Sequence, residues 1–247
     1  MTTPTLHVVN LPGSPERRAS MMQQATALGV ALEFFEAVNG RAGHPLFAHV
    51  HQAKRLARKG RPFRPGELGC WASHYLLWQQ CVASNRPIIV LEDDIVLEAR
   101  LPELLHALPL LPTDVGYFRL HAGDCPGMVW RRFGDFVLHR YWRSPMCTLG
   151  YYLAPVAAKR FLAHADTWIL PVDDYMDLAW LHGVECLGLK PGVVSAADGF
   201  ASTIRAGGRQ KATVGPVGLL RREAHRAWLR LRWHLHNLPA RLLARAH

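Results

Sequence analysis

The sequence lacks any long hydrophobic run. Its longest uninterrupted aliphatic stretch is the four residues from Ile88 to Leu91. A membrane-spanning helix needs roughly 20 consecutive apolar residues, so we expect no segment to cross a bilayer. The start of the chain, Met1 to Leu11, has neither a basic cluster nor a long apolar stretch, which argues against a secretory signal. We therefore expect a protein of the cytoplasm.

Cysteine is scarce and scattered, with five residues and no Cys-x-x-Cys pair. They are Cys70, Cys81, Cys125, Cys147 and Cys186. An odd number of separated cysteines fits neither a disulfide framework nor a cysteine-rich zinc site. Cys70 and His74 have the spacing of two zinc ligands, but no further Cys or His pair supplies the remaining ligands. The sequence therefore predicts that no zinc binds there.

Acidic residues are nearly absent from the carboxyl-terminal part of the chain. Residues 205–247 hold 10 Lys and Arg against the single Glu223, whereas residues 1–204 hold 19 against 18 acidic residues. The net charge of +10 therefore belongs almost entirely to this last segment. With 49% hydrophobic and 19% charged residues, the 247-residue chain can bury a full core, which excludes intrinsic disorder.

Patterns of apolar residues predict an α/β fold. A strand is expected over residues 5–10, a helix over residues 15–29 that starts at Ser14-Pro15, and a second strand over residues 31–36. This order predicts a parallel βαβ unit. A basic loop follows, with one short helix around residues 47–58, and then a long helix over residues 65–85.

The middle of the chain predicts a mixed sheet. Further strands are expected over residues 88–91, 115–120, 148–153 and 184–189, a hairpin over 129–133 and 136–142, and helices over 155–165 and 174–182. Trp71, Tyr75 and Trp78 recur at helical spacing in the long helix, and we expect them in the core rather than in a sugar-binding platform.

The last segment, residues 217–236, predicts a basic amphipathic helix. Its apolar side holds Leu220, Ala224, Ala227, Leu231 and Leu235, and arginines surround the rest. We therefore expect two parts, an α/β domain over residues 1–210 and a basic helical tail over residues 211–247. Such a helix fits adsorption to an anionic membrane. The alternative is a helix docked on the domain with its arginines in water.

Three consecutive carboxylates, Glu92, Asp93 and Asp94, follow the strand of residues 88–91 directly. Ligand sites of open α/β folds lie at the carboxyl ends of parallel strands. The apolar run of residues 95–97 resumes at once, so the acids are expected to interrupt a core strand. Buried carboxylates repel each other unless a cation binds, and oxygen ligands suit Mg²⁺ or Mn²⁺ with a substrate diphosphate. A solvated acidic turn is the alternative.

Seven short motifs, in order, resemble those of glycosyltransferase family 25, which includes bacterial lipooligosaccharide galactosyltransferases and procollagen galactosyltransferases. The resemblance reaches about residue 205 and leaves the tail outside. The motifs are Val8-Val9-Asn10-Leu11 with Ser14-Pro15-Glu16-Arg17-Arg18, Ala37-Val38-Asn39-Gly40, Gly66-Glu67-Leu68-Gly69-Cys70 with Ser73-His74, Leu91-Glu92-Asp93-Asp94-Ile95, Gly150-Tyr151-Tyr152-Leu153, Pro171-Val172-Asp173-Asp174, and Ser202-Thr203-Ile204.

This resemblance implies a GT-A type nucleotide-sugar-binding fold with a mixed, mainly parallel central sheet, a UDP-sugar donor, most often UDP-galactose, a divalent Mn²⁺ or Mg²⁺, and inversion at the anomeric carbon. The three acids would be the counterpart of the DxD motif. Asp94 would be the direct metal ligand. Glu92, a second candidate ligand, or Asp93 would hold metal-bound water or the donor ribose and sugar.

Inversion by single displacement needs one general base on the acceptor hydroxyl. Asp173 and Asp174 are the candidates, because they follow Pro171-Val172 at the start of a predicted helix. The sequence leaves open which of the two is the base. The alternative for this pair is N-capping, which Asp favours.

Further residues are candidates for donor binding. Asn10 ends the first strand, and Arg17 and Arg18 follow in the next helix, where arginine can pair with phosphate; a solvated helix face is the alternative for Arg18. By resemblance, Asn39 would face the ribose or uracil, although it also fits a simple turn. Glu67 and His74 share one stripe of the long helix, where His74 contacts the donor or metal-bound water, or is a core histidine.

The sequence thus predicts an inverting, metal-dependent glycosyltransferase that moves a sugar, galactose by resemblance, from a UDP-sugar to a hydroxyl of a lipooligosaccharide or similar glycan, at the inner face of the cytoplasmic membrane. Two alternatives assign the protein to other functional classes. A nucleic-acid-binding protein would use the basic tail, but no nucleic-acid-binding motif supports specific recognition. A family member that binds sugar nucleotide without transfer is the other; the intact acids disfavour it.

Overall fold

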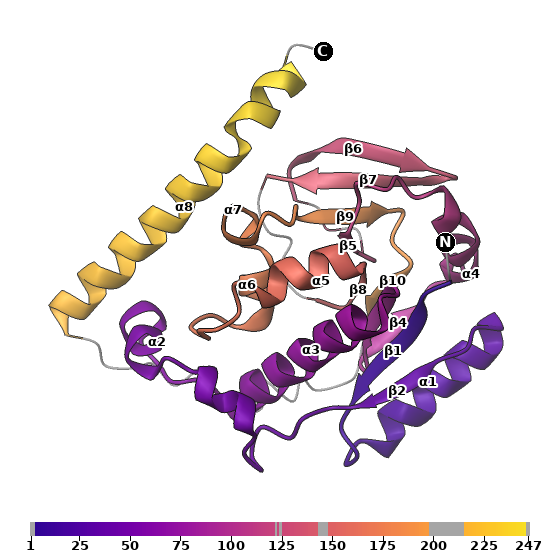
Figure 1. Cartoon of the computed structure of the whole chain (residues 1–247), viewed down its shortest axis with the longest axis horizontal. Helices are drawn as coiled ribbons and strands as arrows, with labels where there is room; N and C mark the ends of the chain where they lie inside the picture. The colour runs from indigo at the N-terminus through magenta and orange to yellow at the C-terminus, as the bar shows by residue number, and fades with distance from the viewer. Residues whose placement is uncertain (1–2, 122, 124, 143–147, 198–214, 246–247) are drawn as a thin grey trace.

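The computed structural model describes residues 3–121, 123, 125–142, 148–197 and 215–245. An eight-stranded sheet lies at the centre, in the order β2-β1-β3-β8-β5-β9-β7-β6, with helices on both faces (Figure 1). Its strands are β1 (Thr5–Asn10), β2 (Glu33–Glu36), β3 (Ile88–Glu92), β5 (Tyr117–Arg119), β6 (Gly127–Phe133), β7 (Phe136–Tyr141), β8 (Gly150–Leu153) and β9 (Leu187–Lys190). The described strands are mixed in direction, as the sequence predicts.

Most strands of this sheet point the same way. β1 lies between β2 and β3 and is parallel to both, which confirms the predicted βαβ unit. β8 is inserted antiparallel between β3 and β5, and β7 runs antiparallel to both β9 and β6. β8 and β7 therefore oppose the direction of the other six, and the carboxyl ends of β1, β2 and β3 meet at one edge of the sheet.

The helices are α1 (Pro15–Leu28), α2 (Gln52–Lys59), α3 (Pro65–Ser84), α4 (Leu101–Ala107), α5 (Pro155–Leu162), α6 (Val172–Met176), α7 (Ala179–His182) and α8 (Pro216–Arg245), with 3₁₀ turns η1 (Pro45–His49) and η2 (Leu108–Leu110). Side chains of α1 and α4 pack on one face of the sheet, and those of α3, α5 and α6 on the other. Three layers result. In the described residues, no helix combines the length and the apolar character that crossing a bilayer requires.

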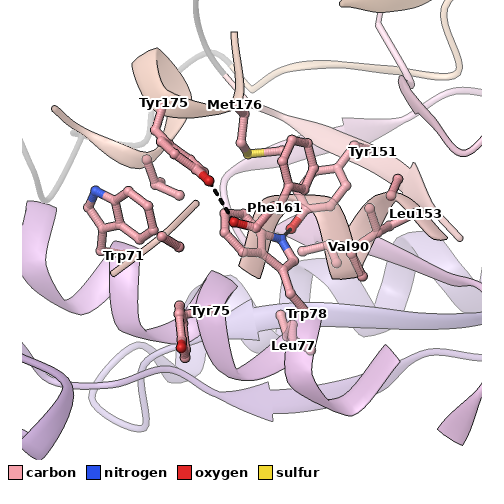
Figure 2. Packing of buried hydrophobic residues seen from close by; sticks show 14 of the residues in the cluster. Trp71, Tyr75, Leu77, Trp78, Val90, Tyr151, Leu153, Phe161, Tyr175 and Met176 are labelled. Carbon is pink, nitrogen blue, oxygen red and sulfur yellow. Dashed lines mark hydrogen bonds between the residues drawn. The ribbon is translucent and has the colours of Figure 1, made fainter. Parts of the chain in front are cut away.

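The core under α3 is aromatic (Figure 2). Trp71 and Trp78 are 1% and 0% exposed, so the prediction that they belong to the core is confirmed. The Trp71 ring stacks on Trp168 at a centroid distance of 4.7 Å, and the Tyr175 hydroxyl donates to the Phe161 carbonyl oxygen at 2.6 Å. Truncation of a buried tryptophan typically costs about 3–5 kcal/mol. This packing fixes α3 against the sheet.

The structure corrects two predicted elements. Residues 95–97 do not continue β3: they form a separate strand, β4 (Ile95–Leu97), paired antiparallel with β10 (Val194–Ala196). The three acids therefore occupy a corner between two sheets rather than the middle of a strand. The single helix expected over residues 174–182 is two short helices, α6 and α7. The chain turns at Asp177, whose buried carboxylate accepts a hydrogen bond from Arg119 at 2.6 Å.

Helix α8 runs along one side of the domain, beside α2 and α7 (Figure 1). Trp228 packs edge-on against Trp180 of α7 at 5.1 Å, and His236 Nε2 lies 3.3 Å from the Glu185 carboxylate. The apolar side predicted from the sequence faces away from the domain: Leu220, Leu231 and Leu235 are all exposed. The helix thus docks, but through its opposite side.

Ser202-Thr203-Ile204, Cys147 and the predicted boundary at residue 210 lie outside the described residues. The division into residues 1–210 and 211–247 stays a prediction.

Candidate active site

The middle acid of the triplet, Asp93, is bound by two buried side chains of the domain. Its Oδ2 accepts a hydrogen bond from Asn10 Nδ2 at 2.8 Å, and its Oδ1 accepts one from Arg17 Nη1 at 2.6 Å. All three side chains are buried. The structure therefore brings these three predicted residues together, where they tie the start of α1 to the end of β3. Their roles toward a donor stay predictions.

Asp94 lies beside the contacts of Asp93 with Asn10 and Arg17, and it is half-buried. Its Oδ2 is 3.3 Å from Arg17 Nη1. Burial, and after it the negative charge of Glu92, raise the pKa of the Asp94 carboxyl, and Arg17 offsets only part of this effect. The corner therefore holds more negative charge than its cation neutralises, a condition that a divalent ion relieves.

Glu92 is held by a chain of three buried groups. Trp78 Nε1 donates to the Tyr151 hydroxyl at 3.0 Å, and that hydroxyl lies 2.8 Å from His74 Nδ1. His74 Nε2 in turn lies 3.2 Å from Glu92 Oε1. An indole N–H can only donate, so the Tyr151 oxygen accepts from Trp78, and His74 Nδ1 is the acceptor within reach of the Tyr151 proton. In this arrangement Nε2 of His74 is the ring nitrogen that donates to Glu92.

Cys70, His74 and Glu92 form a cluster whose ligand atoms lie within 4.8 Å of one another, which calls for a test of the zinc alternative. The hydrogen-bond chain occupies both ring nitrogens of His74, one as acceptor and one as donor. Burial, then the charges of Glu92 and Asp173, raise the pKa of the Cys70 thiol well above its ordinary value, so the thiol stays protonated. His74 is therefore the group that positions Glu92, and the absence of zinc at this cluster stays a prediction.

Asp173 reaches the same corner from α6. The carboxylates of Glu92, Asp94 and Asp173 all lie close enough to Cys70 to raise the pKa of its thiol. Asp173 is half-buried, and its Oδ1 accepts the backbone N–H of Asp174 at 2.9 Å. Burial, followed by the charge of Asp174, raises the pKa of Asp173. A carboxylate with a raised pKa is a better proton acceptor for a hydroxyl.

Asp174 has a different environment. Its Oδ2 forms an ion pair with Lys59 Nζ at 2.5 Å, so this carboxylate joins α6 to α2. Neither acid is the N-cap of α6, a position that belongs to Pro171; they lie in its first turn. The N-capping alternative is therefore wrong, because the helix begins two residues earlier than the sequence pattern indicates.

A cavity of about 550 Å³ lies at the carboxyl ends of β1 and β2. This volume is typical of small-molecule sites. The lining residues are Leu11, Pro12, Gly13, Ser14, Glu36, Ala37, Val38, Asn39, Ala42, Gly43 and His44. Asn39 lines the cavity, and its Oδ1 accepts the backbone N–H of Arg41 at 3.0 Å, so it also builds the predicted turn. Asn10 donates to the Ser14 carbonyl oxygen at 3.3 Å, which connects the cavity to the acidic corner.

The wall of this cavity rests on α3 through two glycines. A Cβ at Gly69 would lie 2.3 Å from the Val38 carbonyl oxygen, and a Cβ at Gly40 would lie 1.7 Å from the Pro65 carbonyl oxygen. Only glycine permits this approach. The motif glycines at these positions therefore set the width of the cavity.

Glu67 is turned away from the cavity residues and into a cluster of arginines. Both of its carboxylate oxygens accept hydrogen bonds from Arg55 and Arg61. Burial favours the neutral form, but hydrogen bonds from Arg61 and the Arg64 backbone lower the pKa of Glu67 overall. These contacts join α2 to α3, and a role of Glu67 in donor binding stays a prediction.

Two residues of this site carry no role in the sequence-based prediction. Tyr151, which contacts His74, belongs to the motif Gly150-Tyr151-Tyr152-Leu153, but the sequence assigns it no role beyond a tyrosine in an apolar strand. Lys59, the partner of Asp174, is one of several cations in a segment predicted to be mostly loop. Both act through contacts with residues far away in the chain.

Comparisons with known proteins agree with the motifs. Residues 3–124 match the family model described as "Glycosyltransferase family 25 (LPS biosynthesis protein)". A "Glycosyltransferase 25 family member" of Aedes aegypti is 33% identical over 188 residues, which cover 70% of this chain and 30% of that protein. "Procollagen galactosyltransferase 1-B" of Xenopus laevis is 28% identical over 73% of this chain and 31% of its own length.

The relatives are longer and not uniform in activity. A "Probable inactive glycosyltransferase 25 family member 3" of Rattus norvegicus is 26% identical over 68% of this chain and 32% of its own length. The matches therefore span about a third of these curated relatives. With the motifs, the family model and the relatives in agreement, the chain is identified as a member of glycosyltransferase family 25.

Proposed function

We propose that this chain is an inverting glycosyltransferase with a GT-A type fold, which moves a sugar, with galactose as the first candidate, from a UDP-sugar to a hydroxyl of a glycan such as a lipooligosaccharide. One observation carries the proposal: a carboxylate oxygen of Glu92 lies within 4.8 Å of Cys70 Sγ, the charges of Asp173 and Asp94 also act on this thiol, and the cavity at the ends of β1 and β2 is joined to this corner through Asn10. The cavity then takes the nucleotide, and the acids take the reacting groups.

The carboxylates of this corner are suitable ligands for a divalent metal ion. Burial and then the negative charge of Glu92 raise the pKa of Asp94. The His74 ring contacts Oε1 of Glu92, which leaves Oε2 for a metal ion. Asp94 and Glu92 would hold Mn²⁺ or Mg²⁺, which suit carboxylate oxygens. When bound, such an ion supplies charge stabilisation to the departing diphosphate.

Of the two candidates that the sequence leaves open, Asp173 is proposed as the general base. Lys59 neutralises Asp174, whereas the contact of Asp173 within the described residues is the single N–H at Oδ1. Its Oδ2 would accept the proton of the acceptor hydroxyl while that oxygen bonds to the anomeric carbon. The bond from this carbon to the UDP oxygen breaks in the same step, so the electron pair leaves with UDP.

The experiment measures UDP release from a panel of UDP-sugars with simple glycoside acceptors, with and without Mn²⁺. We expect one donor to be turned over and Mn²⁺ to be required. Asp94→Asn and Asp173→Asn should each lower kcat by at least roughly 100-fold. Asp135→Asn, an exposed acid in the β6–β7 turn, is the matched control. Full activity of Asp94→Asn would overturn the metal assignment, and turnover by Asp173→Asn would overturn the base.

The exposed face of α8 supports a peripheral membrane location on the inner leaflet. Leu231, Leu235 and Leu238 are 54%, 55% and 50% exposed, and Arg230 and Arg241 lie along the same helix. Exposed leucines beside arginines are typical of helices that adsorb to anionic bilayers. Sedimentation with phosphatidylglycerol vesicles tests this. Leu231→Gln with Leu235→Gln should release the protein, and unchanged retention would contradict the assignment.

A further inference from the structure

A group of nitrogen donors lies between α2 and the first half of α8. Arg58 comes from α2, and Arg222 and His225 come from α8, which packs beside α2 (Figure 1). Burial, then the positive charges of Arg58 and Lys59, lower the pKa of His225. These side chains therefore share one environment in which positive charge accumulates.

The donors of this group lack acceptors. Arg222 Nε and His225 Nε2 are buried, and neither has a hydrogen-bond partner among the residues that the structure describes. Arg58 is half-buried, and burial alone lowers its pKa, with no offsetting charge from a described carboxylate. Two other cations of α2 are paired: Arg55 with Glu67 and Lys59 with Asp174. Unmet buried donors are unfavourable unless water or a ligand satisfies them.

We propose that Arg58, Arg222 and His225 form a binding site for a phosphate group carried by the acceptor, an inference that rests on the proposed transferase function. Guanidinium groups match phosphate oxygens in charge and geometry. The cavity assigned to the nucleotide is lined by residues 11–14, 36–39 and 42–44 and includes none of these three side chains, so the phosphate is not that of the donor.

The position of the site favours the acceptor. Lys59, the next residue after Arg58, binds Asp174, and Asp174 is the neighbour of the proposed base Asp173. A phosphate held by Arg58 would therefore bind on the part of α2 that Lys59 joins to α6. An acceptor glycan with a phosphate substituent would reach both places with adjoining parts of one molecule.

Direct binding is tested on the full chain with inorganic phosphate, without donor or acceptor. The His225 imidazole is followed by NMR during the titration. We expect a saturable change, with His225 binding its proton more tightly in the presence of phosphate. Arg58→Gln and Arg222→Gln should each weaken phosphate binding roughly ten-fold. Arg58→Lys should recover part of the affinity, which separates loss of charge from loss of fold.

The matched control is Arg230→Gln, which removes the same charge from the same helix on its exposed side. It should leave phosphate affinity unchanged. No saturable effect on His225, or equal weakening in Arg58→Gln and Arg230→Gln, overturns the site. Thermal melting of each variant shows that the comparison is between folded proteins. Because this titration needs no turnover, phosphate binding by an inactive protein would count against the proposed function and leave the site standing.

Two further measurements identify the source of the phosphate. With transferase activity established, Arg58→Gln should lower the ratio of kcat/KM for a phosphorylated over an unphosphorylated glycoside acceptor roughly ten-fold, and Arg230→Gln should not. In the second, binding to phosphatidylglycerol vesicles is compared for the same variants. Vesicle binding that depends on Arg58 and not on Arg230 assigns the site to a lipid headgroup and overturns the acceptor assignment.

Discussion

Replacement of Tyr151 by Phe removes one hydroxyl from the chain that holds Glu92. Tyr151 is fully buried, and burial raises the pKa of its hydroxyl well above the ordinary value, so the group stays protonated and donates. In Tyr151→Phe, Trp78 Nε1 loses its acceptor and His74 Nδ1 loses its donor. The ring keeps its shape, so the effect is confined to these hydrogen bonds.

The magnitude follows from two buried hydrogen bonds, of 3.0 Å and 2.8 Å. Each contributes about 1 kcal/mol, and the unmet Trp78 donor adds about 1–3 kcal/mol. The free energy of unfolding should therefore fall by about 3–5 kcal/mol, as measured by urea denaturation. Tyr152→Phe is the control, because the neighbouring tyrosine stacks on Phe118 on the opposite face of the sheet.

The functional effect should exceed what lost stability explains. Without the Tyr151 proton, His74 can carry its own proton on Nδ1, and Nε2 then no longer donates to Glu92. Groups that orient a metal ligand typically change metal affinity by about 10–100-fold. The Mn²⁺ concentration for half-maximal transfer should rise by that factor in Tyr151→Phe and stay constant in Tyr152→Phe. An unchanged Mn²⁺ requirement in folded Tyr151→Phe would refute the reasoning.

Three further predictions follow from single groups. Gly69→Ala should lower the free energy of unfolding by about 1–3 kcal/mol and raise the KM for the donor, because the new Cβ would lie 2.3 Å from the Val38 carbonyl oxygen. Urea unfolding and donor titration measure the two effects, and Gly215→Ala, where a Cβ meets nothing within 4 Å, is the control. Burial raises the pKa of Asp173 above 3.8, so kcat/KM should fall with acid at a higher pH than for an ordinary aspartate, as a pH–rate profile shows. Burial lowers the pKa of His182 from 6.5 to about 4, so the unfolded chain takes up the proton first. Stability should be full above pH 6.5 and fall by about 3 kcal/mol toward pH 4, and His182→Gln should remove this dependence in urea unfolding.

The features that can be predicted from the sequence are those that depend on residues close together in the chain. The βαβ unit and the position of the acids at the end of β3 follow from apolar periodicity within short windows. The turn that places these acids between two sheets, rather than within one core strand, does not follow from it. The insertion of β8 between β3 and β5 could not be predicted, because strand pairing over such separations leaves no local pattern. The same holds for the contact between Tyr151 and His74, which are 77 residues apart.

For helix α8, the sequence predicts the helix but not the side on which it docks. Its amphipathic pattern predicts an apolar side, and that side is the exposed one, whereas the docked side combines Leu229, His236 and Asn237 with the domain. A docked face of mixed composition has no periodic hydrophobic pattern. The tail could therefore be predicted as a helix, but its orientation could not.

The side chains at the end of β3 point alternately to the two faces of the sheet, and this predicts how each acid of the triplet can vary in evolution. Along β3, Val90 packs toward α3 and Leu91 toward α1, so Glu92 reaches His74 while Asp93 reaches Arg17 on the opposite side. Substitutions of Asp93 should be tolerated only with compensating changes at Arg17 or Asn10. Glu92 and Asp94 should instead vary with the ligand that each lineage uses. We therefore expect adjacent positions of this motif to be under separate selection.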